Sequence, residues 1–265
     1  MKERDLDGVQ RIVFKMAGFD EKFIDTALST PNSEMWRPTA DALIKARVVT
    51  SLSDGLQYMP KDGAADRLSK ALPIFEILKT RFPMEFNELV DEYQDGVVKG
   101  KVESYVVQQT RLRLVALIVS KIPLADDDVL ADYNKLLVDE YTALGFKNPT
   151  SCYLYATEGD PKGTLHKEFP QGLQQREQAI HERVLRTAGM RQNIKASDVQ
   201  PIYDKVNDQL VAHGATDEDF ALLGPGKLDA SKHAAYCNFA TSFFRELSKL
   251  PAGESALAMR HIMKK

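Results

Sequence analysis

The chain has few cysteines, no long uncharged apolar run and no excess of one charge, and each absence excludes a class of protein. With only two cysteines in 265 residues, it is not a disulfide-rich scaffold. Its 35 Lys and Arg residues are balanced by 38 Asp and Glu residues, so it lacks the basic surplus of nucleic-acid-binding domains. Its most apolar long segment contains Arg111, Arg113 and Lys121, which excludes a membrane span there. We therefore expect no nucleic-acid partner and no transmembrane segment in this chain.

The sequence also lacks the short motifs of the common catalytic and cofactor sites. It has no GxSxG, HExxH or CxxC motif, and the stretch closest to a phosphate-binding loop, Gly224–Lys227, lacks the earlier glycine and the following Ser or Thr. The acidic run Asp126–Asp128 is not a calcium loop, because Ala131 and Leu137 stand where glycine and glutamate are needed. We predict no cofactor, no metal site and no assigned catalytic residue.

What the sequence does contain is a series of periodic apolar segments separated by Gly and Pro. Within these segments apolar residues recur three and four positions apart, which is the period of an amphipathic helix. Alternating segments joined by hairpin turns, the signal for strands, are scarce. The sequence predicts an all-α protein, an irregular multi-helix bundle of roughly eight to ten helices.

The most apolar of these segments covers residues 101–122, KVESYVVQQTRLRLVALIVSKI, between Gly100 and Pro123. About twenty residues is too long for an ordinary strand and suits a helix. From Leu112 to Val119 apolar residues occupy nearly every side, as in helices with neighbours on several faces. We therefore place this helix at the centre of the bundle.

Two stretches without helical periodicity interrupt the chain. Residues 53–63 contain two glycines and a proline and are the best candidate for a boundary. They divide an N-terminal helical segment, residues 1–56, from a helical bundle domain, residues 57–265. The second stretch, residues 156–172, is long for a loop inside a compact domain, which makes it a candidate functional region.

The two cysteines, Cys152 and Cys237, form either one disulfide or two buried free thiols, and the sequence is compatible with both. A bond would close a loop long enough to stabilise the fold by about 4–5 kcal/mol in the chain-entropy model. A disulfide requires an oxidising compartment such as a bacterial periplasm, whereas free thiols suit a cytoplasmic protein.

His233 and Cys237 lie four positions apart on a predicted helix, so their side chains share a face. Together with Cys152 they could supply three zinc ligands, or the histidine could act as the base for a nucleophilic thiol. A buried or disulfide-bonded cysteine is the simpler interpretation, and we keep His233 as a candidate site residue without a metal.

A second pair, Glu177 and His181, has the same spacing on a helix rich in Glu, Gln and Arg. A solvated helix surface produces such pairs without any function. His166, in the aperiodic stretch, completes the set of candidate site residues.

A stretch near the N-terminus carries a pattern of a known family. Its positions are Gly18-Phe19-Asp20, Phe23, Ala27-Leu28, Thr30-Pro31, Met35-Trp36, Pro38-Thr39, Leu43, Ala46 and Val48-Val49-Thr50. The pattern resembles the C-terminal edge of bacterial envelope proteins with a ClpP/crotonase-like domain. The resemblance implies that this chain is the downstream, mostly helical part of a longer protein of the bacterial cell envelope. No catalytic residue is carried over, because the α/β portion has no counterpart here.

Two functions are consistent with these features. The helical character and the missing catalytic motifs favour a non-catalytic interaction or scaffold module of a bacterial envelope protein, with another protein as its partner. The alternative is a hydrolase-like enzyme of unrecognised type with a site near residues 156–172. A deep pocket with convergent His, Cys or carboxylate groups would favour the enzyme, and a shallow apolar face would favour the module.

Overall fold

The computed structural model describes residues 3–31, 36–49, 58–160, 162–191 and 193–264. These residues form fourteen α-helices and a few short 3₁₀ turns, without a strand among them, which confirms the predicted all-α bundle. The chain divides into two compact units, Met1–Met59 and Pro60–Lys265. The boundary expected between residues 56 and 57 lies outside the described residues.

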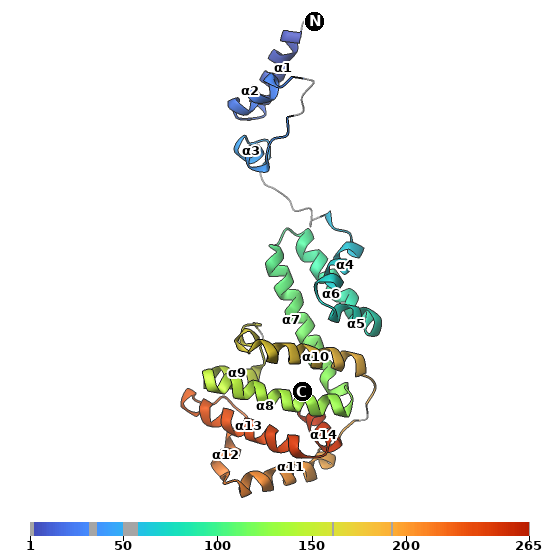
Figure 1. Cartoon of the computed structure of the whole chain (residues 1–265), viewed down its shortest axis with the longest axis vertical. Coiled ribbons are helices and arrows are strands. Elements are labelled where there is room, and N and C mark those ends of the chain that lie inside the picture. The colour runs from blue at the N-terminus through green and yellow to red at the C-terminus, as the bar shows by residue number, and fades with distance from the viewer. Residues whose placement is uncertain (1–2, 32–35, 50–57, 161, 192, 265) are drawn as a thin grey trace. The chain divides into compact units, whose positions relative to one another are not determined.

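The N-terminal unit contains three helices, α1 (Glu3–Met16), α2 (Glu21–Ser29) and α3 (Ala40–Lys45) (Figure 1). Asp20 begins α2 because its carboxylate accepts the backbone N–H of Phe23 at 3.2 Å. The Phe23 ring packs against Trp36 with 4.8 Å between centroids. Met35 and Thr50, two positions of the family-like pattern, lie outside the described residues.

The C-terminal unit contains the other eleven helices. They are α4 (Lys61–Ala71), α5 (Ile74–Arg81), α6 (Pro83–Val98), α7 (Glu103–Lys121), α8 (Asp127–Lys147), α9 (Pro149–Glu158), α10 (Gln171–Thr187), α11 (Ala196–Ala212), α12 (Asp217–Leu222), α13 (His233–Lys249) and α14 (Ala252–Ile262), with 3₁₀ turns at η2 (Ile122–Leu124), η3 (Leu165–Glu168) and η4 (Ala230–Lys232). None of the described helices is both long enough and apolar enough to cross a bilayer.

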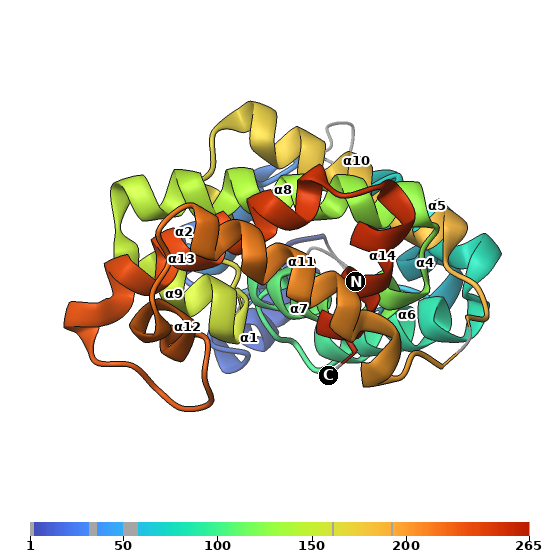
Figure 2. The ribbon, with the colours of Figure 1, turned by 90° about the horizontal axis from the view of Figure 1, so that it is seen from below.

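Helix α8 is the element around which this unit packs. It contacts α9, α10, α13 and α14, and both ribbon views show α10 lying along it (Figures 1 and 2). Leu136 and Leu144 of α8 are fully buried. The side-chain amide of Asn134 donates to the Phe244 carbonyl and to Ser255 Oγ, each at 3.2 Å, which ties α8 to α13 and α14.

The helix predicted over residues 101–122 is present as α7, but its predicted central position is wrong. Its buried residues, Val106, Thr110, Leu114 and Ile118, follow a single face, which packs against α6 and α10. Val119 is 41% exposed on the remaining surface. Because its neighbours cover only part of it, α7 keeps an apolar face that the described residues bury incompletely, with Leu112 and Val115 half-buried and Val119 exposed.

A cleft beside helix α8

The open face of α7 forms one wall of a large cleft in the C-terminal unit. The cleft has a volume of about 1400 Å³ and is bordered by α7, α8, α9, α10, α11 and α13. Leu112, Val115 and Val119 line it from α7, three and seven positions apart on one helical face. Phe243 and Phe244 add aromatic surface from α13. The cleft therefore has an extended apolar wall.

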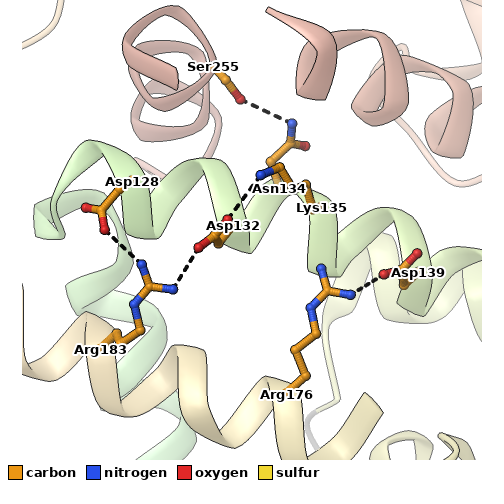
Figure 3. A network of polar contacts seen from close by, with 8 residues as sticks. All are labelled: Asp128, Asp132, Asn134, Lys135, Asp139, Arg176, Arg183 and Ser255. Carbon is orange, nitrogen blue, oxygen red and sulfur yellow. Dashed lines mark hydrogen bonds and ion pairs between the residues drawn. The ribbon is translucent and has the colours of Figure 1, made fainter. Parts of the chain in front are cut away.

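Helix α10 supplies the polar wall, and two arginines hold it in place on α8 (Figure 3). The Arg183 guanidinium donates to Asp132 at 2.7 Å and to Asp128 at 2.8 Å. Arg176, two turns earlier on the same helix, pairs with Asp139. The two arginines are seven residues apart on one side of α10, so the pairs show which side of this helix faces α8.

The loop before α10 brings a histidine to this wall. The two carboxylate oxygens of Asp160 accept the backbone N–H groups of Thr164 and His166, both at 2.9 Å. The folded loop places His166 Nδ1 at 2.5 Å from Glu177 Oε2. Because a carboxylate can only accept, Nδ1 is the donor in this contact.

His181 lies one turn beyond Glu177 on α10 and also lines the cleft. Burial lowers the pKa of His181 below its ordinary value, the Glu177 carboxylate partly opposes this effect, and His166 adds to it. The His181 imidazole is therefore neutral at physiological pH and offers one donor and one acceptor.

A second acidic group lies behind the wall. Glu140 is only 1% exposed, and the Tyr155 hydroxyl, which borders the cleft, donates to its Oε2 at 2.9 Å. Burial and the charge of Glu177 raise the pKa of Glu140 well above its usual range. Glu140 Oε1 is buried without a hydrogen-bond partner among the described residues. The environment of Glu140 therefore favours the protonated form of its carboxyl group.

Three of the predicted site residues meet in this cleft, namely His166, Glu177 and His181. Glu177 contacts His166, whereas the sequence suggests Glu177 and His181 only as a pair on a solvated helix surface. Glu140 was missed, although the sequence carries a signal for it. Glu140 lies three residues after Leu137 and four before Leu144. This helical spacing places Glu140 on the same apolar face as the two leucines, which predicts that it is buried.

His233 lies elsewhere and serves packing. Its ring stacks on Tyr153 with centroids 4.0 Å apart, and its nitrogens lie 3.1 Å from Thr150 Oγ1 and 3.3 Å from the Leu228 carbonyl oxygen. Both nitrogens are thus engaged, so His233 has neither a free lone pair for a metal nor a place in the cleft.

Cys152 and Cys237 lie at disulfide distance, with their Cα atoms 6.1 Å apart, inside the range that a bond requires. Both are buried away from the cleft. The described residues contain no group of three or more His, Cys, Asp or Glu side chains that could hold a metal ion. The zinc arrangement considered for Cys152, His233 and Cys237 has no geometric support.

The groups bonded to His166 limit the reactions that the cleft could catalyse. Nucleophilic catalysis needs a hydroxyl or thiol within hydrogen-bond reach of a base. In the described part of the chain, His166 bonds to no Ser, Thr or Cys side chain. The polar groups can bind a ligand through hydrogen bonds, and His166 can accept a proton from one.

Comparison with family models, with curated proteins and with solved structures finds no match to this chain.

Proposed function

We propose that the C-terminal unit is a non-catalytic interaction module that binds part of a partner protein in the cleft. The observation that carries the proposal is the open apolar face of α7, formed by Leu112, Val115 and Val119. An apolar helix face gains stability when a partner removes it from water. The cleft volume of about 1400 Å³ exceeds the roughly 300–1,000 Å³ of small-molecule sites, which favours a polypeptide as the occupant.

The module belongs, on this proposal, to a protein of the bacterial cell envelope and faces the periplasm. The resemblance of residues 18–50 to bacterial envelope proteins supports the assignment. The approach of Cys152 and Cys237 supports it too, because disulfides persist in oxidising compartments.

Site-specific photo-cross-linking tests the binding role. A photoreactive amino acid replaces Val115 in the apolar wall, and the purified chain is irradiated in a native bacterial envelope extract. We expect a protein adduct, identified by mass spectrometry, at this position. The matched control replaces Gln209, an exposed residue of α11 outside the cleft. The absence of a protein adduct at 115, or the same adducts at both positions, contradicts the proposal.

An acid–base enzyme is the second candidate, favoured by the 2.5 Å contact between His166 and Glu177. A carboxylate-held imidazole is the arrangement of a general base. A screen against ester, amide and phosphate-ester substrates decides the matter. Turnover that falls about 100-fold or more in His166→Gln, but not in the exposed control His213→Gln, would favour the enzyme over the module.

A further inference from the structure

Uncharged amide side chains line the polar part of the cleft in unusual number. They are Gln171, Gln174, Gln175 and Gln178 of α10, with Gln200 and Asn207 of α11. The four α10 positions follow the spacing of one helical face. We call these four residues the glutamine face.

The anchoring of α10 directs this face away from α8. Gln178 lies two residues after Arg176, which is about 200° further round the helix. Gln171 and Gln174 fall within about 40° of the same direction. Because Arg176 and Arg183 pair with acidic residues of α8, the glutamine face points away from these pairs, and its four residues line the cleft.

Much of the hydrogen-bonding capacity of these amides is unused. Gln171, Gln175 and Asn207 form no side-chain hydrogen bond with the described residues, and Gln174 and Gln178 use only their Nε2 atoms, toward the Phe169 carbonyl at 2.8 Å and Glu182 at 3.3 Å. Each primary amide has a carbonyl that accepts and an NH₂ group that donates. A peptide backbone presents the same neutral pair of groups at every residue.

The charges in the cleft oppose a lipid or another anionic ligand. Three acidic residues line it, Glu158, Asp160 and Glu177, against one basic residue, Arg111. A fatty-acid carboxylate or a phospholipid head group would need a cationic cluster, whereas a peptide backbone carries no charge.

We propose that the cleft binds a short extended segment of a partner protein, with its backbone amides on the glutamine face and its apolar side chains on α7. The inference rests on the proposed function and adds the chemistry of recognition. From Gln171 to His181 the wall is about 15 Å long, which matches four to five residues of extended chain at about 3.3 Å each.

Fluorescence anisotropy with a defined probe tests the proposal. The probes are a panel of labelled, acetylated and amidated hexapeptides with leucine or valine at alternate positions and serine between them. The variant carries Gln171→Met and Gln175→Met, which keep side-chain length and remove both hydrogen-bonding groups. We expect binding about tenfold or more weaker than that of the native chain. Gln209→Met is the matched control and leaves the affinity unchanged. Gln171 and Gln175 are exposed, and circular dichroism checks that the double variant folds.

A second probe asks whether the backbone itself is bound. Replacing the two central amides of the best hexapeptide by esters removes two N–H donors and leaves the side chains in place. We expect the ester analogue to bind the native chain more weakly, with a smaller additional loss in the double methionine variant, because the two changes remove the same contacts. Equal binding of the amide and ester probes overturns the inference.

The remaining outcomes separate the two proposals. A protein cross-link at Val115 without binding of any hexapeptide overturns the extended-segment inference and leaves the interaction role standing. Failure of both tests overturns both. Binding of palmitate in preference to the hexapeptides, unchanged in the double methionine variant, identifies the cleft as a lipid site instead.

Discussion

Glu140 places an acidic side chain in the core of the helix that organises the C-terminal unit. The Tyr155 hydroxyl satisfies one of its oxygens, and the other is unpartnered among the described residues. An ionised carboxylate there would carry a large desolvation penalty, and this penalty favours the protonated form and raises the pKa of Glu140. Because burial raises its pKa, Glu140 makes the stability of the folded protein sensitive to rising pH.

We predict that Glu140→Gln makes the stability of the protein less sensitive to rising pH. The folded-state pKa of Glu140 lies well above its ordinary value of 4.5, so the folded protein holds a proton that the unfolded chain releases. This contribution is fully present below the unfolded pKa and is lost as pH rises through the folded pKa. Glutamine keeps an acceptor for Tyr155 without a titrating group. Urea unfolding at several pH values above about 5 should show the variant gaining stability relative to the native protein. Parallel stability curves would rule out a raised pKa at this position.

Helices α7 and α8 show why apolar content alone does not identify the central helix of a bundle. Helix α7 is the more apolar along its middle, yet one of its faces borders the cleft. Helix α8 looks less like a central helix because its buried positions include two polar side chains, Asn134 and Glu140. Those groups are compatible with burial only through partners on other helices, which the local sequence does not reveal.

The sequence predicts where helices end more readily than which helices pack against one another. Proline and glycine mark most of the boundaries, as local backbone chemistry requires. Gly145 is an exception, since α8 continues to Lys147. A Cβ at Gly145 would lie 3.2 Å from Cys237 Sγ, so this glycine serves the close approach of α13.

We predict that Gly96→Ala separates α6 from α7. A Cβ at this position would lie 2.8 Å from Val106 Cγ1 and 2.9 Å from its Cγ2, closer than real contacts allow. Overpacking of this kind should destabilise the C-terminal unit by about 1–3 kcal/mol, despite the better helix propensity of alanine. Gly172→Ala is the matched control, because nothing lies within 4 Å of its added methyl group. Thermal unfolding compares the two, and equal midpoints would show that α7 yields without cost.

The site was predictable in its residue types and not in its geometry. His166, Glu177 and His181 were identified from their chemistry, and the glutamine face is visible in the sequence QGLQQREQ at helical spacing. The contact between His166 and Glu177 depends on how Asp160 folds the loop that carries His166. No local periodicity describes such a contact, because it joins a loop to a helix.

For the whole molecule, the pairing of Cys152 with Cys237 is the feature with the largest expected effect on stability. The two residues are separated by 85 positions, and they connect α9 to α13. A cross-link across so long a loop restricts the unfolded chain, which stabilises the folded state by about 4–5 kcal/mol in the chain-entropy model.

We predict that thiol titration in denaturant finds no reactive thiol before reduction and both cysteines after it. Reductant should lower the free energy of unfolding by about 4–5 kcal/mol. The Cys152→Ser, Cys237→Ser double variant serves as the control, because reductant should leave its stability unchanged. Two reactive thiols before reduction would show that the cysteines are free and would remove one of the two supports for a periplasmic location.

The same pairing has a mechanical consequence. When a force pulls the two ends of the oxidised chain apart, the load passes from α9 directly to α13 through the bond. The residues between the cysteines, 153–236, which include α10 and its glutamine face, then carry no tension. The fully stretched chain is shorter by about 280–310 Å than its reduced form. The oxidised chain under tension would therefore keep the polar wall of its cleft outside the path of the force.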